Sequence, residues 1–288
     1  MIKHLRLKAY GKINLALDVL GRRDNGYHDV RMIMQTVGLH DRIELYRTKE
    51  PGIRLETNLF YLPNNEQNLA YRAAALLMEE FGVKEGVSIK LKKFIPVSAG
   101  MAGGSTDAAA VLFGVNKMFG LGLSIKELME RGVKLGADIP YCLMRGTALS
   151  EGIGEKLSTI PAMPSCYILI AKPNIHVSTK WVYTNLVLDE HTNHPDIDGM
   201  LASMKKRDLL SLSNQIGNIL ESVTIPAYPQ IAAIKECMLQ NGALGSLMSG
   251  SGPTVFGIFD DKDKAMAAKE KCRELPYRCF VFVTDLYR

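Results

Sequence analysis

The sequence predicts an α+β fold in two domains, residues 1–157 and 158–288. We expect a mixed α/β N-terminal domain that carries a glycine-rich loop and a C-terminal split βαβ (ferredoxin-like) domain. Three observations support this fold class. Apolar residues alternate as in strands, a glycine-rich segment lies between a strand and a helix, and the second half has the order β-α-β-β-α-β once additional helices are set aside.

Two periodicities place the elements of the N-terminal domain. Period-two alternation predicts strands near residues 5–19, 43–45, 53–55 and 87–91. Helical periodicity predicts one helix at residues 69–81 and another that follows the glycine-rich segment and ends near Gly120. A capping box of Ser124 and Glu127 begins a further helix, which we expect to be closed by Gly136.

The C-terminal domain has shorter strands. Apolar runs predict strands near residues 166–171, 244–248, 255–259 and 280–284. Helical patterns predict helices from a cap at Ser178 through Tyr183 and near residues 209–220, 231–239 and 262–274. The polar, proline-containing stretch at residues 189–198 is expected to be a loop.

The composition of the 288 residues excludes several classes of protein. With 47% hydrophobic residues and nearly balanced charge, the chain is too apolar to be disordered. Its net charge of +5 comes from short basic clusters far apart, which is typical of solvated surface and not of a nucleic-acid-binding face. Early lysines and arginines leave no room for a signal core, and no apolar run approaches the ~18 residues that span a bilayer. The sequence therefore predicts a soluble, cytoplasmic protein that binds neither nucleic acid nor membrane.

The cysteines and histidines do not indicate a metal site. The five cysteines are odd in number, widely spread and without a C-x-x-C pair, which argues against disulfides or a thiolate zinc site and favours a reducing compartment. His191 and His194 have no acidic partner in an H-E-x-x-H arrangement, so we interpret them as loop histidines. No side chain is assigned as a metal ligand.

The segment at residues 96–110 is the most unusual in the chain. Its three glycines let the backbone approach a ligand without Cβ clashes, and the following helix directs unpaired N–H groups and its positive dipole end at the loop. Together these features predict an anion site best suited to phosphate. Ser105 and Thr106 add hydroxyls that can donate to phosphate oxygens or hold a metal ion. A capped helix after a flexible turn would also explain the glycines.

Neither common nucleotide-binding motif fits this segment. No lysine follows the last glycine, as a Walker A motif requires, and the spacing of G-x-G-x-x-G fails. Nucleotide binding by another route is the phosphate interpretation that remains. A second glycine-rich turn at residues 249–254 is explained by hairpin chemistry alone, or it directs backbone N–H groups toward a substrate or phosphate.

Lys12 and Asp138 are the candidates for reactive side chains. Lys12 interrupts the apolar alternation of its strand, and Asp138 follows a helix end. Each alone fits a surface or turn residue. In one cleft, a carboxylate would take a hydroxyl proton while an ammonium stabilises developing charge. The spacing does not show that they meet.

Three motifs, in this order, resemble the GHMP kinases, the superfamily named for galactose, homoserine, mevalonate and phosphomevalonate kinases. They are Lys12–Leu15, the 96–110 loop and residues 249–257. Within this superfamily, residues 21–28, the Gly-Gly-Ser-Thr-Asp-Ala form of the loop and residues 136–140 resemble the 4-diphosphocytidyl-2-C-methyl-D-erythritol kinase family. The resemblance spans almost the whole chain, and the combination of motifs is highly specific.

The resemblance implies a small-molecule kinase. Its members transfer the γ-phosphoryl group of ATP, with Mg²⁺ expected, to the 2-hydroxyl of a cytidine-diphosphate substrate in non-mevalonate isoprenoid synthesis, as a monomer or homodimer. By resemblance, Asp138 is the catalytic base and Lys12 assists it. The implied ATP-binding residues are Asn68, Lys93, Pro96, Val97, Ser98, Ala99, Gly100, Met101, Ala102, Gly103, Gly104, Ser105 and Thr106. The implied substrate residues are Asn14, Tyr27, His28, Thr179 and Tyr183, with the tyrosines and His28 at the cytidine end.

The chain departs from the family pattern at two places. The family commonly has Ala-Pro-Ala-Lys where this chain has Ala9-Tyr10-Gly11-Lys12. In the loop, Met101, Ala102 and Thr106 replace the commoner Leu, Gly and Ser. Threonine keeps the hydroxyl, while Ala102 restricts one backbone position. The loop chemistry and the reactive pair are therefore expected to persist.

Three other functions differ from this interpretation in what each would require. A kinase of the same superfamily acting on mevalonate, homoserine or a sugar would not require a cytidine group. A nucleotide-binding regulator would bind ATP without consuming it and would not need Lys12 or Asp138. An RNA-binding split βαβ domain would need aromatic stacking platforms that the C-terminal strands lack.

Overall fold

The computed structural model describes residues 2–190 and 192–287, so the interpretation of His191 lies outside the described residues. Its chain contains these strands: β1 (His4–Arg22), β2 (His28–Thr48), β3 (Gly52–Thr57), β4 (Gly86–Lys92), β5 (Thr147–Gly152), β6 (Lys156–Thr159), β7 (Tyr167–Pro173), β8 (Gly217–Asn218), β9 (Gly245–Met248), β10 (Val255–Phe259) and β11 (Cys279–Asp285). The helices are α1 (Leu69–Glu80), α2 (Gly103–Phe119), α3 (Ile125–Gly132), α4 (Ile139–Met144), α5 (Thr179–Asn185), α6 (Ile197–Lys206), α7 (Leu209–Gln215), α8 (Glu221–Ala227), α9 (Gln230–Gln240) and α10 (Lys262–Glu274).

The chain forms two compact units that interleave along the sequence. Unit 1 contains residues 1–11, 39–97 and 102–145, and unit 2 contains residues 12–38, 98–101 and 146–288. The division expected from the sequence at residue 157 stays a prediction. The compact units cross it, because unit 2 takes segments from the N-terminal part of the chain.

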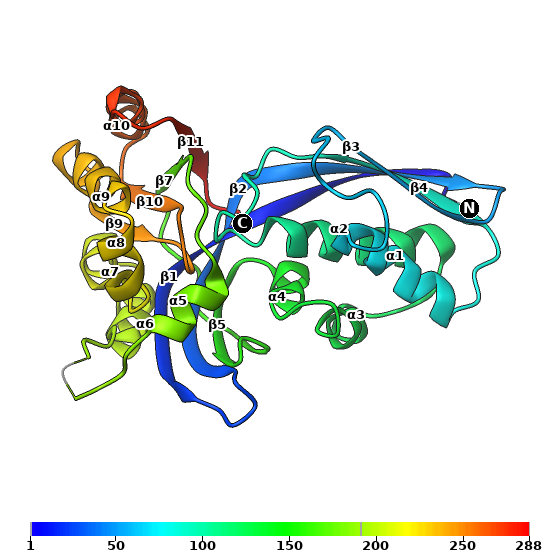
Figure 1. Cartoon of the computed structure of the whole chain (residues 1–288), viewed down its shortest axis with the longest axis horizontal. Helices are drawn as coiled ribbons and strands as arrows, with labels where there is room; N and C mark the ends of the chain where they lie inside the picture. The colour runs from blue at the N-terminus through cyan, green and yellow to red at the C-terminus, as the bar shows by residue number, and fades with distance from the viewer. Residues whose placement is uncertain (1, 191, 288) are drawn as a thin grey trace. The chain divides into compact units, whose positions relative to one another are not determined.

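In unit 1, helices cover a four-stranded region of the first sheet. Its strand order is β3-β4-β2-β1, with β4 antiparallel to β2 and parallel to β3. Helices α1 and α2 pack against each other on one face of this region (Figure 1). Their apolar faces supply much of the core: Leu77, Val111, Leu112 and Val115 are fully buried.

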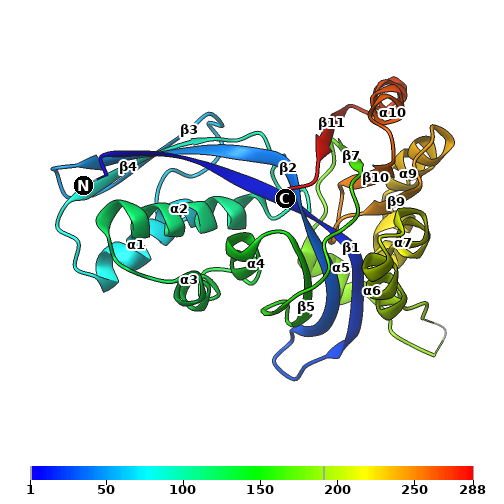
Figure 2. The same ribbon diagram turned by 180° about the vertical axis from the view of Figure 1, so that it is seen from behind.

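In unit 2, the remaining parts of β1 and β2 pair with other strands. β5 pairs antiparallel with β2, and β8 pairs parallel with β1. A separate four-stranded antiparallel sheet has the order β11-β7-β10-β9. With α9 and α10 packed on it, this sheet has the strand order 4-1-3-2 of a ferredoxin-like split βαβ domain, which confirms the predicted C-terminal fold (Figure 2).

The structure corrects three expected elements. Helix α3 ends at Gly132 and not at Gly136, because the chain closes there in turns in which Leu135 and Gly136 donate to the Gly132 carbonyl. The expected loop at 189–198 ends earlier, since Asp196 caps α6. The expected helix at 209–220 stops at Gln215, because the next residues form β8 beside β1.

No helix in the described part of the chain combines the length and the apolar character that crossing a bilayer requires.

Candidate active site

The glycine-rich loop leads into α2, whose N-terminus is open to a ligand. Gly104 is exposed, and Ser105 is half-buried with a hydroxyl that makes no hydrogen bond within the described residues. The first N–H groups of a helix have no intrahelical acceptor, so they and the Ser105 hydroxyl can receive an anion. Thr106 is different. Its buried hydroxyl donates to the carbonyl of Tyr10 at 2.7 Å, so it fixes α2 to β1.

The backbone of the loop is strained at two non-glycine positions. Ser98 and Ala102 have φ of 51° and 55°, in the left-handed region that L-residues disfavour. Ala102 is also the N-cap of α2, so its conformation sets the angle at which the loop enters the helix. Ala102, whose backbone we expected to be restricted, thus adopts a disfavoured conformation. The loop keeps its shape at a cost in stability.

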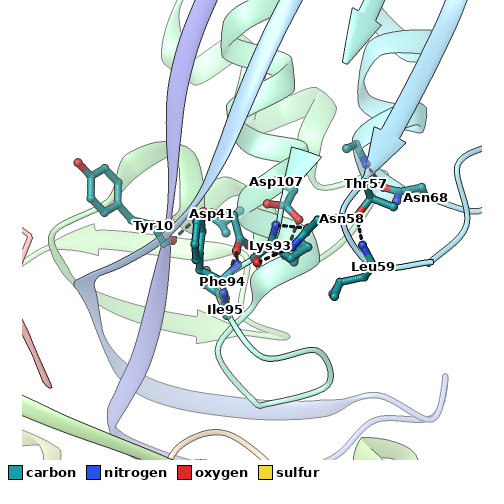
Figure 3. A network of polar contacts seen from close by, with 12 residues as sticks. Tyr10, Asp41, Thr57, Asn58, Leu59, Asn68, Lys93, Phe94, Ile95 and Asp107 are labelled. Atoms are coloured by element: carbon teal, nitrogen blue, oxygen red, sulfur yellow. Dashed lines mark hydrogen bonds and ion pairs between the residues drawn. The ribbon is translucent and has the colours of Figure 1, made fainter. Parts of the chain in front are cut away.

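A buried ion network joins the two ends of the loop (Figure 3). Lys93 comes directly after β4. Its ammonium pairs with Asp41 from β2 and with Asp107 from α2, and the pair with Asp107 has a distance of 2.6 Å. The second oxygen of Asp41 accepts the N–H groups of Phe94 and Ile95 at 2.5 and 2.8 Å. Lys93 thereby connects the segment before the loop to the helix after it.

The charges in this network are unequal, because two carboxylates share one ammonium. Burial raises the pKa of Asp107 well above its usual range, and the Asp41 charge adds to the rise while Lys93 opposes it. Burial alone would lower the pKa of Lys93, but the charges of Asp107 and Asp41 outweigh that effect and raise it. The Oδ1 atom of Asp107 is buried and has no hydrogen-bond partner among the described residues. Asp107 is therefore easier to protonate than an exposed aspartate, and its protonation would leave Lys93 paired with the Asp41 charge.

Two asparagines arrange the backbone near Lys93. Asn58 accepts from the Lys93 N–H at 2.8 Å and donates to the Lys93 carbonyl at 3.3 Å, so it pairs with the chain as a neighbouring strand would. Asn68 caps α1 by accepting from Ala70 N at 2.9 Å and donates to the Pro63 carbonyl at 2.8 Å. Both nucleotide candidates, Lys93 and Asn68, therefore use their polar side-chain groups within unit 1, and their contact with ATP stays a prediction.

Lys12 is a buried cation without an anionic partner. It is 6% exposed, and its ammonium donates to Asn14 Oδ1 at 2.7 Å but forms no ion pair with any residue that the structure describes. Asn14 is fully buried and places its amide nitrogen 3.4 Å from the sulfur of Met32. The Lys12 backbone N–H also donates to the Met101 carbonyl at 3.2 Å. The residue that bears the cation thus binds the glycine-rich loop directly.

The second glycine-rich turn packs on the same loop within unit 2. The Ser249 hydroxyl donates to the Gly100 carbonyl at 3.0 Å. A Cβ built on Gly100, which has φ of 70°, would lie 2.3 Å from the Ser249 carbonyl oxygen. Only glycine fits at position 100, so the turn packs closely against the glycine-rich loop as well as joining β9 to β10.

Asp138 is held at the start of α4. It is the N-cap of that helix, with Pro140 in the first turn. Its carboxylate is half-buried and makes no hydrogen bond or ion pair within residues 2–190 and 192–287. A carboxylate left free in this way can accept a proton from a substrate hydroxyl. The structure describes Asp138 in unit 1 and Lys12 in unit 2, each in its own surroundings.

The candidate substrate residues of unit 2 include the aromatic rings of Tyr27, His28 and Tyr183. Tyr27 is 59% exposed after the β1–β2 turn, and the ring centroids of His28 and Tyr183 lie 5.1 Å apart. Burial, aided by the Arg22 charge, lowers the pKa of His28, so this ring is neutral at pH 7. Thr179 lies within hydrogen-bond distance of the Ser251 hydroxyl, at 2.8 Å. The arrangement offers flat rings to a base and hydroxyls to a polar group.

Comparison with known proteins shows the family to which the chain belongs. The model of the GHMP kinases N terminal domain matches residues 68–146, and the GHMP kinases C terminal model matches residues 200–278. The chain is 54% identical over 286 residues to a 4-diphosphocytidyl-2-C-methyl-D-erythritol kinase of Lachnospira eligens, which covers 99% of both chains. The chain belongs to the 4-diphosphocytidyl-2-C-methyl-D-erythritol kinase family. A second member of the family, from Lachnoclostridium phytofermentans, is 55% identical over 98% of this chain and 97% of its own.

A solved structure extends the family relation to the fold. The crystal structure of a 4-(cytidine 5'-diphospho)-2C-methyl-D-erythritol kinase superposes with a TM-score of 0.85 and 30% identity, and covers 99% of this chain and 100% of its own. This family member therefore has the two-domain α+β fold of the GHMP kinases, as the sequence predicted.

Sequence reasoning missed two residues of the site region in this family member. Asp41 anchors Lys93 and two backbone N–H groups, and Asn58 pairs with Lys93. Asp41 interrupts the alternation of Leu39, Ile43 and Leu45 on β2, and a charge at a fully buried strand position is the signal that would have found it. Asn58 lies in a polar loop and has no comparable signal.

Proposed function

We propose that this chain phosphorylates the 2-hydroxyl of 4-diphosphocytidyl-2-C-methyl-D-erythritol with ATP, in non-mevalonate isoprenoid precursor synthesis. The observation that carries the proposal is the buried Lys12 ammonium, which has no carboxylate partner within the described residues and whose backbone binds the glycine-rich loop. A buried cation without an anionic partner is costly unless an anion arrives. Membership of the kinase family, at more than half identity over nearly the full length, supports a phosphate as that anion.

Asp138 takes the proton in the proposed reaction. Its free carboxylate accepts the proton of the 2-hydroxyl as the oxygen attacks the γ-phosphorus. The bond between the γ-phosphorus and the β,γ-bridging oxygen breaks, and ADP leaves. Lys12 stabilises the charge that develops on the transferred group, because phosphoryl transfer needs mainly positioning and charge neutralisation.

The nucleotide phosphates occupy the glycine-rich loop in this proposal. The open N–H groups at the start of α2 and the free Ser105 hydroxyl supply donors. Mg²⁺ enters with ATP as part of the substrate. Magnesium keeps several waters and binds phosphate oxygens, so it needs only one or two protein carboxylates.

The cytidine end of the acceptor is assigned to Tyr27, His28 and Tyr183. The neutral His28 ring lies beside the Tyr183 ring, and such a pair can stack on or bond to a pyrimidine without adding charge. Asn14 and Thr179 supply polar groups in the same unit. These assignments rest on the family motif and on the ring contacts.

An ATP-consumption assay with three acceptors tests the proposal. The cytidine-diphosphate acceptor is compared with mevalonate and homoserine at equal concentration, and we expect turnover with the cytidine compound only. Asp138→Asn should lose at least 10³-fold in kcat while it still binds ATP, since the carboxylate acts on the hydroxyl proton. Turnover with mevalonate or homoserine, or near-normal turnover in Asp138→Asn, would overturn the substrate or the base assignment respectively. ATP binding without consumption would favour a regulator.

A further inference from the structure

Asn218 is a buried residue of unit 2 whose amide is fully used on backbone groups. It is 7% exposed and lies on β8, opposite Leu17 of β1. Its Nδ2 donates to the carbonyls of Met248 and Gly250 at 2.8 and 2.7 Å, and its Oδ1 accepts from Leu220 N at 3.0 Å. The amide orientation is fixed, because two of its neighbours are carbonyl oxygens and the third is an N–H group.

Asn218 and Glu221 together hold the end of an edge strand. β9 lies at the edge of the four-stranded sheet, so within the described residues one side of its backbone pairs with no strand. At Met248, the last residue of β9, Glu221 Oε1 accepts the N–H at 2.8 Å while Asn218 Nδ2 donates to the carbonyl. Glu221 is held in turn by Lys235 at 2.5 Å. Two side chains thus replace a strand where β9 ends.

The bond from Asn218 to Gly250 extends beyond this strand into the glycine-rich turn at residues 249–254. Gly250 has φ of 59°, and a Cβ built on it would lie 3.3 Å from the Gly100 carbonyl and 3.7 Å from Asn14 Oδ1. The turn therefore lies against the glycine-rich loop and against the amide that accepts from Lys12. Its position is set from β8 by one side chain.

The remaining contacts of the turn also lead to the proposed site. Ser249 donates to Gly100, and the Ser251 hydroxyl lies 2.8 Å from that of Thr179. An amide that only completed the edge of β9 would need the Met248 carbonyl and no more. The second donor bond, to Gly250, fixes the turn itself.

We infer that Asn218 is a positioning residue for phosphoryl transfer, which acts by holding the 249–254 turn against Gly100 of the glycine-rich loop and Asn14 of the Lys12 strand. This role rests on the proposed function. Asn218 touches neither substrate; it fixes the backbone that fixes the loop. Misplacement of a site by about 1 Å can cost on the order of 10²-fold in rate.

The test compares Asn218→Asp with a matched control, Asn116→Asp. Asn116 is also buried, at 6% exposure, and its amide also holds backbone, since it donates to the Leu123 carbonyl at 2.8 Å and accepts from Leu123 N at 3.0 Å near the end of α2. In each variant an oxygen faces the carbonyl that the amide nitrogen held. Asn218→Ala removes the bonds without this repulsion and serves if the Asp variant fails to fold.

We expect the Asn218 variant to lose at least tenfold in kcat relative to Asn116→Asp, with the KM for the cytidine acceptor changed by less than about threefold. Amide hydrogen exchange at Ser249 and Gly252 should rise at least tenfold in the Asn218 variant only, because these N–H groups close the turn. The inference is overturned if kcat stays within twofold of the control or if exchange in the turn does not change.

A failure of the proposed function has a different signature. Wild-type protein would then transfer nothing to the cytidine acceptor, and affinity for a non-hydrolysable ATP analogue would replace kcat as the readout. Because the turn holds Gly100 of the loop, the Asn218 variant should then bind the analogue at least tenfold more weakly than the Asn116 control. Equal affinity of the two variants would overturn the positioning role.

Discussion

The two carboxylates beside Lys93 should respond unequally when each is replaced by an amide. Asp41→Asn and Asp107→Asn each replace one oxygen of a buried carboxylate by an NH₂ group. In Asp41, one oxygen accepts two backbone N–H groups and the other pairs with Lys93, so either orientation of the amide sets donors against donors. In Asp107, one oxygen has no partner among the described residues, and the NH₂ group can take that place.

The magnitudes follow from these partners. Removal of one partner from a buried ion pair costs about 3–5 kcal/mol, and Asp41 has two further bonds to lose, so Asp41→Asn should destabilise by at least that amount. Asp107→Asn keeps an acceptor for Lys93 and leaves a one-to-one pair of Lys93 with Asp41. It should therefore change the free energy of unfolding by no more than about 1 kcal/mol in either direction.

Urea unfolding at pH 7, followed by circular dichroism, measures both changes. The difference between the two variants should exceed about 2 kcal/mol, with equal slopes against urea. Equal losses would refute the reasoning, since they would mean that the two carboxylates contribute alike. A larger loss for Asp107→Asn would show that its charge, and not that of Asp41, holds the ammonium.

The pH dependence of stability isolates Asp107. Its pKa is raised in the folded chain, so above about pH 4 the unfolded chain loses this proton first. The folded state then binds more protons, and the free energy of unfolding falls as pH rises until the folded carboxyl also ionises. The raised pKa of Lys93 acts only near and above its ordinary value of about 10.4. The stability of wild type minus that of Asp107→Asn should therefore decrease from pH 5 to pH 8; a constant or rising difference would contradict the assignment.

The remaining predictions concern the substrate rings, the strained loop and the buried cation. Tyr27→Ala and His28→Ala should raise the KM for the cytidine substrate at least tenfold and that for ATP less than threefold; equal increases would remove their substrate role. Ala102→Gly relieves a left-handed alanine and should stabilise by about 0.5–1 kcal/mol in urea unfolding, whereas a loss of stability would mean that φ of 55° is not strained. Lys12→Met should lower kcat at least 10²-fold while it raises the urea midpoint, because the lone ammonium is costly without its anion. An unchanged kcat would exclude Lys12 from the reaction.

Local sequence signals predicted most of the fold. The capping box of Ser124 and Glu127 forms, and α10 spans the residues that its pattern predicted. Apolar runs also identified the strands that make the 4-1-3-2 sheet. These features depend on neighbouring residues, so periodicity and capping chemistry reveal them.

Features that depend on distant residues were not predictable in this way. The expected helix at 209–220 stops before Gly217 because that residue pairs with Ala16, about two hundred positions earlier. Similarly, the sequence places Lys93 at the end of a strand, and only the structure shows that it pairs with Asp41 and Asp107. The motifs therefore predicted candidate site residues, while the side chains that hold the glycine-rich loop in place became visible only in three dimensions.

The interleaving of the two units has a consequence for protein synthesis. Residues 12–38 leave the ribosome early, yet they belong to a unit whose other residues, 98–101 and 146–288, come later. The edges of β2 and β1 that pair with β5 and β8 therefore stay unpaired until those strands are synthesised, and unpaired strand edges promote aggregation. A nascent chain that stops before β8 leaves an edge of β1 unpaired, so we expect it to bind chaperones more readily than a chain in which β8 has paired with β1.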